Sequence, residues 1–197
     1  MIKKLSKKAS LLSALVLTMA LFAGCSNEKE NQKVADIEVK TIATKELQDK
    51  LSDDSWVVVD TRINDAFNGW KLDEVERGGH IKGAVDFSAN WLTVDSKDKE
   101  KTLDKALETK GIEKDKNIVL YDANGKDAKE VANYLSEKGY KNLYTYNVAD
   151  WAKDESLPME SYENYEMIVP ATIVNDILDG KKPETFENSK NIKIVEA

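Results

Sequence analysis

The sequence contains very few residues that bind metals or react as nucleophiles. Its 197 residues include one cysteine, Cys25, and one histidine, His80. A single cysteine excludes a disulfide bond within the chain and a metal site rich in cysteine. Neither a glycine-rich nucleotide fingerprint nor a set of histidines at metal-binding spacing is present. The sequence therefore predicts no metal and no cofactor.

Positive charge is also scarce over most of the chain. The net charge is −7, and the first 24 residues carry four lysines and no acidic residue. Without them, 25 basic residues remain against 36 acidic ones, a net charge of −11. Because a phosphate backbone binds basic patches, nucleic acid is not expected as a partner. Charge alone is not expected to bring the chain to an anionic lipid surface either.

The first 24 residues have the organisation of an export signal. A lysine-rich start precedes a mostly apolar run from Leu11 to Ala23, which is too short to span a membrane comfortably. With Ala23 and Gly24 before Cys25, the pattern resembles a bacterial lipoprotein signal peptide, although Phe22 stands where such signals usually have leucine. The resemblance implies cleavage before Cys25 and a lipid on its sulfur. An ordinary secretory signal is the alternative.

This resemblance implies a cellular location and a chemical consequence. The protein would be extracytoplasmic in the cell envelope, anchored through Cys25 to the lipid bilayer as its partner. Residues 25–38 are polar and charged, which is typical of a flexible tether. A lipidated Cys25 would leave the mature chain without any free thiol, so an enzyme that works through a cysteine could not be built from it.

A strand, a short loop and a helix are predicted in the middle of the chain. Ile118–Tyr121 is apolar and suits a buried strand, and Asp122–Gly125 is a polar loop. Val131, Ala132 and Leu135 follow at helical spacing, and Gly139 is placed to end the helix. Inward-pointing loop N–H groups and the helix dipole would favour negative charge. The pattern predicts an anion-binding cradle.

Two parts of the sequence resemble a rhodanese domain. Val119–Gly125, with Gly139–Tyr144 and Trp151, resembles the half that carries the active loop. Val57–Arg62, with Arg77–Val85, resembles the other half. The resemblance assigns residues 39–160 to one rhodanese-like domain. It implies a three-layer α/β fold with a mainly parallel central sheet and helices on both faces, which the alternation of predicted strands and helices also favours.

The resemblance also locates the site of the family's chemistry. Rhodaneses transfer a sulfane sulfur through a cysteine persulfide, and the position of that cysteine is Asp122 here. The active-site loop would comprise Asp122, Ala123, Asn124, Gly125 and Lys126. A carboxylate cannot carry sulfur, so no catalytic residue is expected. Aspartate at this position also resembles the first domain of two-domain rhodaneses, in which the second domain carries the cysteine.

Further residues near the site have two interpretations each, one structural and one functional. In the rhodanese pattern, Asp60 and Arg62 are structural and tie neighbouring loops by hydrogen bonds; the alternative for Arg62 is binding an anion. His80 suits a general base by its chemistry, but the pattern implies a loop residue that satisfies backbone groups. Phe67 and Trp70 are expected to pack as an aromatic pair beside the loop, or to line a substrate pocket. The glycine pair that the family usually has before Trp151 is missing.

Other elements are predicted from apolar spacing and capping residues. Thr44 is expected to cap a helix that carries Leu47 and Leu51. Strands are predicted at Val39–Ile42, Trp56–Val59, Ala84–Phe87 and Asn142–Tyr146, and a helix at Asp98–Lys110.

Residues 161–197 carry a weak internal repeat. Ala171–Leu178 can be laid on Ala43–Lys50, and Ile192–Ala197 on Val57–Thr61, each as a helix followed by an apolar strand. This pattern predicts a linker and the truncated start of a second rhodanese-like repeat. A single domain with a decorated tail is the alternative.

Three functions compete at this point. The first is a non-catalytic, membrane-anchored rhodanese-like module with a binding or structural role, whose partner would be a second rhodanese domain or an envelope protein. The second is the N-terminal part of a thiosulfate or 3-mercaptopyruvate sulfurtransferase whose cysteine lies beyond Ala197. The third makes Asp122 a phosphoryl-accepting nucleophile. That chemistry wants a second acid for Mg²⁺ where Asn124 stands, and Asp127 is expected to point into solvent.

Overall fold

The computed structural model describes residues 38–183, 186, 192 and 193. The predicted signal peptide, Cys25 and nearly all of the predicted tether lie outside these residues. So do residues 194–197, at the end of the strand predicted in the tail. Within the described part of the chain, no helix is long and apolar enough to cross a membrane.

The domain is built on a parallel sheet of five strands, in the order β1-β6-β5-β2-β4. Every neighbouring pair runs parallel, and β5 lies between β6 and β2. A separate antiparallel pair joins β3 and β7. The strands are β1 Lys40–Thr41, β2 Trp56–Asp60, β3 His80–Ile81, β4 Val85–Asp86, β5 Asn117–Asp122, β6 Leu143–Asn147 and β7 Met159–Glu160.

Six α-helices and two short 3₁₀ helices are described. Four of the α-helices cover the sheet, α2 follows β2, and α6 belongs to the tail. They are α1 Thr44–Lys50, α2 Asn64–Asn68, η1 Ala89–Thr93, α3 Lys99–Thr109, α4 Lys126–Glu137, α5 Val148–Ala152, η2 Tyr165–Met167 and α6 Ala171–Leu178.

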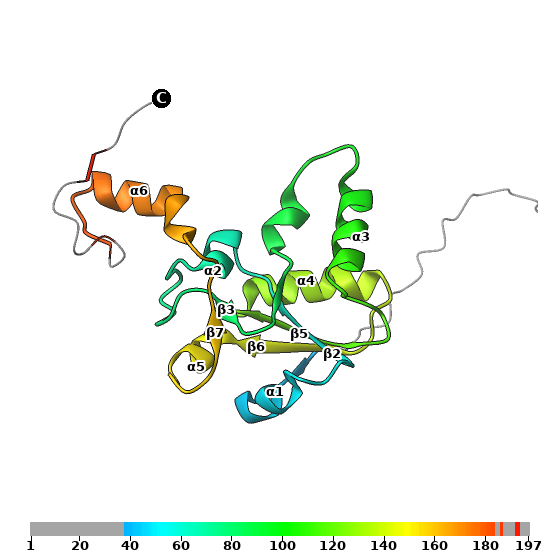
Figure 1. The fold of residues 1–197 in the computed structure, drawn as a ribbon. Helices are drawn as coiled ribbons and strands as arrows, with labels where there is room; N and C mark the ends of the chain where they lie inside the picture. The colour runs from blue at the N-terminus through cyan, green and yellow to red at the C-terminus, as the bar shows by residue number, and fades with distance from the viewer. Residues whose placement is uncertain (1–37, 184–185, 187–191, 194–197) are drawn as a thin grey trace, which may run out of the picture. The chain divides into compact units, whose positions relative to one another are not determined.

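Successive residues of β5 contribute to opposite faces of the sheet, as the twofold period of a strand requires. Ile118 and Leu120 pack with buried leucines and valines of α3 and α4. Val119 and Tyr121 pack in a second core with residues of α1 and α5. Figure 1 shows α3 and α4 on one side of the sheet and α1 on the other. The predicted three-layer α/β fold with a mainly parallel sheet is confirmed.

The predicted elements of the domain are present, with ends shifted by one or two residues. The predicted strands correspond to β1, β2, β4 and β6, and the predicted helix at Asp98–Lys110 is α3. Gly111 and Gly139 follow α3 and α4 with φ of +66° and +89°. Because glycine has no Cβ, it adopts this left-handed conformation readily and allows the chain to leave the helix.

The prediction that Thr44 caps α1 is wrong. Ala43 occupies the cap position, and no side chain there accepts a hydrogen bond. Thr44 is the first helical residue, and its Oγ1 lies 2.9 Å from the hydroxyl oxygen of Tyr146. A tertiary partner on β6 therefore satisfies the threonine, and the local capping role is lost.

The tail is partly described. The helix predicted at Ala171–Leu178 is present as α6. Ile192 and Lys193, at the start of the predicted strand, are not in a strand. The assignment of residues 161–197 to a second repeat stays a prediction.

Candidate functional site: the loop after the central strand

The candidate site lies at the carboxyl end of β5, where ligands bind in open parallel sheets. Asp122 is the last residue of the strand and pairs in register with Asn147 of β6. On the other side of β5, Tyr121 pairs with Asp60, the last residue of β2. The loop Ala123–Gly125 then leads directly into α4. The structure thus brings the ends of three strands to one edge of the sheet.

The carboxylate of Asp122 is held by the backbone of the loop and the first turn of α4. One oxygen accepts a hydrogen bond from Gly125 N at 2.6 Å, and the other accepts one from Ala128 N at 3.0 Å. The residue is 1% exposed. Asn124 Oδ1 accepts a further hydrogen bond from Lys126 N at 3.0 Å. Donors that an external anion would use therefore already bind side-chain oxygens of the chain itself.

Gly125 gives the loop its shape. It stands at the cap position of α4 with φ of +80°, in the left-handed region. A Cβ added there would have no neighbour within 4 Å. The glycine is thus required by the backbone conformation and not by lack of space.

Negative charge surrounds the loop. Asp127, in the first turn of α4, is partly exposed, and the expectation that its side chain points into solvent stays a prediction. Burial raises the pKa of Asp127, and the nearby Asp122 carboxylate raises it further, with smaller contributions from Asp73 and Glu130. Lys126 acts in the opposite direction. An anionic ligand approaching this edge would meet these carboxylates.

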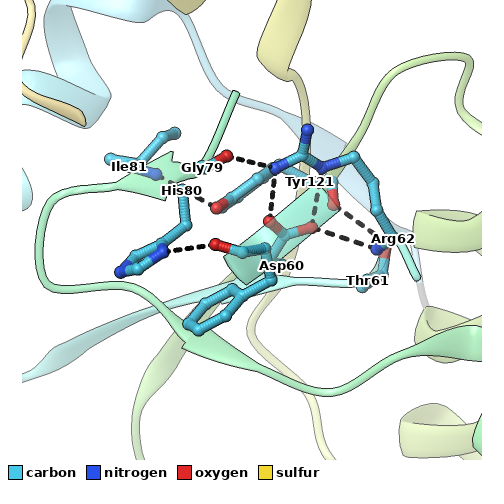
Figure 2. Close-up of polar contacts among 8 residues, drawn as sticks. Asp60, Thr61, Arg62, Gly79, His80, Ile81 and Tyr121 are labelled. Atoms are coloured by element: carbon cyan, nitrogen blue, oxygen red, sulfur yellow. Dashed lines mark hydrogen bonds and ion pairs between the residues drawn. The ribbon is translucent and has the colours of Figure 1, made fainter. Parts of the chain in front are cut away.

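Asp60 and Arg62 form a buried ion pair beside the site (Figure 2). Arg62 Nε donates to Asp60 Oδ1 at 2.9 Å, and Arg62 Nη2 donates to Asp60 Oδ2 at 2.6 Å and to Gly79 O at 2.7 Å. Burial lowers the pKa of the guanidinium, but hydrogen bonding to Asp60 and its charge outweigh this effect and raise it. Two of the three guanidinium nitrogens are thus engaged, and the third, Nη1, is buried without a hydrogen-bond partner among the described residues. The structural role of Arg62 therefore has direct support, and anion binding by Nη1 stays a prediction.

Tyr121 links this pair to both neighbouring segments. Its carbonyl accepts hydrogen bonds from Thr61 N at 3.0 Å and from Thr61 Oγ1 at 2.9 Å. Its hydroxyl accepts one from Ile81 N at 3.2 Å. Burial, followed by the charge of Asp60, raises the pKa of Tyr121 well above its usual range. The residues therefore tie the end of β2 and the start of β3 to the central strand.

His80 lies on β3 and not in the expected loop, and its contacts lie apart from the loop Ala123–Gly125. It does satisfy a backbone group, as expected. Its Nδ1 is 2.8 Å from Phe67 O, so that nitrogen carries the hydrogen, because a carbonyl only accepts. The imidazole stacks on the Phe67 ring with centroids 3.9 Å apart. Its Nε2 lies 4.0 Å from a carboxylate oxygen of Glu160 on β7. Trp70 packs against Tyr165 instead, so Phe67 and Trp70 do not form the expected pair.

The sequence analysis did not predict the role of Arg77, which binds α5 and the segment that follows it. Arg77 donates hydrogen bonds of 2.8 to 2.9 Å to four backbone carbonyls, of Trp151, Ala152, Asp154 and Leu157. All four acceptors lie in α5 or the segment after it. No signal in the sequence identifies them, because backbone carbonyls are present at every residue. The sequence predicted Tyr121 only as an apolar residue of a strand, and not the hydrogen bonds of its hydroxyl and carbonyl groups.

Comparison with known proteins identifies the family. Residues 43–152 match the family model of the rhodanese-like domain, so the chain belongs to that family. This confirms the resemblance seen in the sequence. A comparison with curated protein sequences finds no significant match.

The chain is also similar to solved structures of EanB and of an anaerobic ergothioneine biosynthesis enzyme. The wild-type structure of EanB is 30% identical with a TM-score of 0.68 over 77% of this chain. The anaerobic ergothioneine biosynthesis enzyme from Chlorobium limicola, in complex with trimethyl histidine, is 30% identical with a TM-score of 0.68 over 76% of this chain. In both, the match covers 34% of the solved chain, so the present chain spans about a third of their length.

Proposed function

We propose that this protein is a non-catalytic rhodanese-like domain, anchored to the membrane of the cell envelope and serving a binding or structural role. One observation carries the proposal. The position that the rhodanese pattern assigns to the persulfide-forming cysteine is Asp122, whose carboxylate accepts hydrogen bonds from Gly125 N and Ala128 N. The loop that would stabilise a thiolate instead stabilises the charge of this carboxylate.

Chemistry supports this assignment. Sulfur transfer needs a thiolate that attacks the donor and carries the sulfur as a persulfide, and an aspartate oxygen offers no equivalent. Phosphoryl transfer to Asp122 has less support, because the residue is 1% exposed and therefore closed to a phosphoryl donor. Among the described residues, no group of three or more His, Cys, Asp or Glu could hold a metal ion.

The anchor is proposed from the sequence. A lipid on Cys25 would hold the domain at the bilayer through residues 25–38, and it would also occupy the only thiol of the chain. Mass spectrometry of the mature protein would test this part. A diacylated Cys25 at the new N-terminus supports it, and an unmodified Cys25 contradicts it.

An activity assay tests the absence of catalysis. The purified full-length chain is incubated with thiosulfate and cyanide, and separately with 3-mercaptopyruvate and cyanide, and thiocyanate is measured. We expect no thiocyanate above the protein-free control. Turnover that persists in the Cys25→Ser variant but disappears in Asp122→Ala would contradict the proposal.

A second function has specific support. In that alternative, the chain is the N-terminal part of an active tandem thiosulfate or 3-mercaptopyruvate sulfurtransferase. The helix of the proposed repeat is present as α6, and the chain spans about a third of the solved relatives. The downstream reading frame distinguishes the two. A strand, a cysteine, a loop and a helix in sequence would favour this alternative, and an immediate stop codon would exclude it.

A further inference from the structure

The segment after β7 exposes an unusual number of large apolar side chains. Six large apolar residues are exposed in the described part of the chain, and four of them are Tyr162, Met167, Ile168 and Leu178. Met167 and Ile168 are neighbours with 80% and 77% exposure. The exposed apolar side chains of residues 162–178 are called the tail surface below.

The backbone of this segment is fixed to the domain at several points. Tyr162 N donates to Asn68 O at 2.8 Å, and the indole nitrogen of Trp70 donates to Ile168 O at 3.1 Å. The Tyr165 ring meets Trp70 edge-on, with centroids 5.5 Å apart. It also lies so close to Gly69 that an added Cβ would be 2.4 Å from its atoms. Met167 and Ile168 are thus exposed on a docked segment, and turning them inward would break these contacts.

Acidic residues predominate in this region, where Glu160 pairs with Lys82 and Asp176 pairs with Lys181. Residues 154–180 contain seven acidic residues and no lysine, arginine or histidine. Glu163 and Glu166 are exposed on either side of Tyr165, and neither forms an ion pair with any described residue. The seven residues are Asp154, Glu155, Glu160, Glu163, Glu166, Asp176 and Asp179.

We propose that the tail surface binds a separate protein whose contact surface has an apolar centre and a rim of lysine and arginine. Exposed apolar side chains on a fixed segment are typical of a protein interaction site. The acidic residues around them favour a basic partner through complementary charge. A second copy of the chain would bring like charges together, and an anionic bilayer would be repelled. The proposal rests on the binding role proposed above, but a surface other than the Asp122 loop carries it.

Two synthetic amphipathic peptides serve as probes, one of leucine and lysine and the other of leucine and glutamate. Binding of each labelled peptide to the full-length protein is measured by fluorescence anisotropy. We expect the leucine–lysine peptide to bind, its binding to weaken as salt is added, and its affinity to fall about tenfold or more in the Met167→Ser, Ile168→Ser variant, which removes apolar surface without changing the charge. Val94→Ser is the matched control, because Val94 is 53% exposed but lies elsewhere in the domain.

Several outcomes would overturn the proposal. Equal binding of both peptides, equal binding to the Met167→Ser, Ile168→Ser variant, or the same loss in Val94→Ser would each do so. A dimer in sedimentation that the double substitution abolishes would identify a second copy as the partner. Binding to phosphatidylglycerol vesicles that the substitution abolishes would identify lipid. Thiocyanate formation is measured without any peptide, so a failure of the proposed function is seen separately.

Discussion

Asp60 and Asp122 end neighbouring parallel strands, yet their buried carboxylates are stabilised in different ways. Asp60 is 0% exposed and faces the guanidinium of Arg62, which donates two hydrogen bonds to it. Asp122 is 1% exposed and receives its hydrogen bonds from the backbone N–H groups of Gly125 and Ala128. One acid is matched by a side chain of opposite charge, and the other by a loop and the N-terminus of a helix.

The difference indicates that the two acids have different roles in the domain. The Asp60–Arg62 pair connects β2 to the segment before β3 through Gly79 O, and both of its charges belong to the chain itself. The loop around Asp122 has a geometry suited to an anion, and a carboxylate of the chain itself supplies that anion. Under the proposed function, this rhodanese-like domain keeps the cradle but has Asp122 in place of the cysteine that the rhodanese pattern assigns to it.

Breaking the Asp60–Arg62 pair should have the largest effect. Asp60→Ala leaves the buried Arg62 guanidinium without its counter-ion, which is expected to cost about 3–5 kcal/mol of stability. Urea unfolding followed by circular dichroism measures it. Asp150→Ala is the control, because its carboxylate is 59% exposed and makes only a 3.6 Å contact with Lys153. A loss below about 1 kcal/mol for Asp60→Ala would show that the pair is not the central tie.

Removing the carboxylate of Asp122 should have the second largest effect. Asp122→Ala leaves the N–H groups of Gly125 and Ala128 without acceptors, at a cost of about 1–3 kcal/mol. Asp122→Asn keeps an oxygen acceptor and should cost less. Unfolding and hydrogen exchange of the two amides measure the change. Unchanged protection of both amides in Asp122→Ala would contradict the role given to the carboxylate.

A change at Gly125 should cost less and isolates the loop conformation. Gly125→Ala forces an L side chain into φ of +80° without any steric clash, so the expected loss is about 1 kcal/mol. Gly83→Ala is the matched control, because Gly83 has φ of +79° and also open space for a Cβ. Equal losses would assign the whole effect to backbone strain. A much larger loss at Gly125 would show that the Asp122 hydrogen bonds depend on the shape of the loop.

The smallest effect concerns pH. The pKa of Asp127 is raised from 3.8 in the folded state, so the folded protein binds this proton more tightly than the unfolded chain. The stability contribution of protonated Asp127 is therefore present below its ordinary pKa and is lost as pH rises through the raised value. Asp127→Asn should stabilise the protein slightly at about pH 7 relative to about pH 3. Urea midpoints at both pH values measure this, and a relative loss at the higher pH would contradict the assigned sign.

The fold could be predicted because its signals are local. The apolar run of β5, the polar loop after Asp122 and the spacing of Val131 and Leu135 together indicate a buried strand and a covering helix. The rhodanese pattern then placed Asp60, Arg62 and His80 near one another. Each of these predictions uses residue types that occur at fixed spacing along the chain.

The remaining features depend on partners far apart in the sequence. Arg77 meets carbonyls 74 to 80 residues away, and Thr44 meets Tyr146 across 102 residues. The pairing of His80 with Glu160 in β3 and β7 likewise joins two strands of two residues each. Strands this short have no periodic pattern, and a backbone acceptor has no sequence signature, so neither could be predicted.

The most direct test of the central claim restores a thiol to the cradle. In a full-length Cys25→Ser background, Asp122→Cys is compared with its parent and with Lys129→Cys, a thiol at an exposed position of α4. Each protein is incubated with thiosulfate and its intact mass is measured before and after cyanide. We expect one added sulfur atom, removable by cyanide, on Asp122→Cys alone. No cyanide-removable sulfur on Asp122→Cys, or as much of it on Lys129→Cys, would contradict the account, because the loop would then favour a thiolate no more than an exposed helix position does.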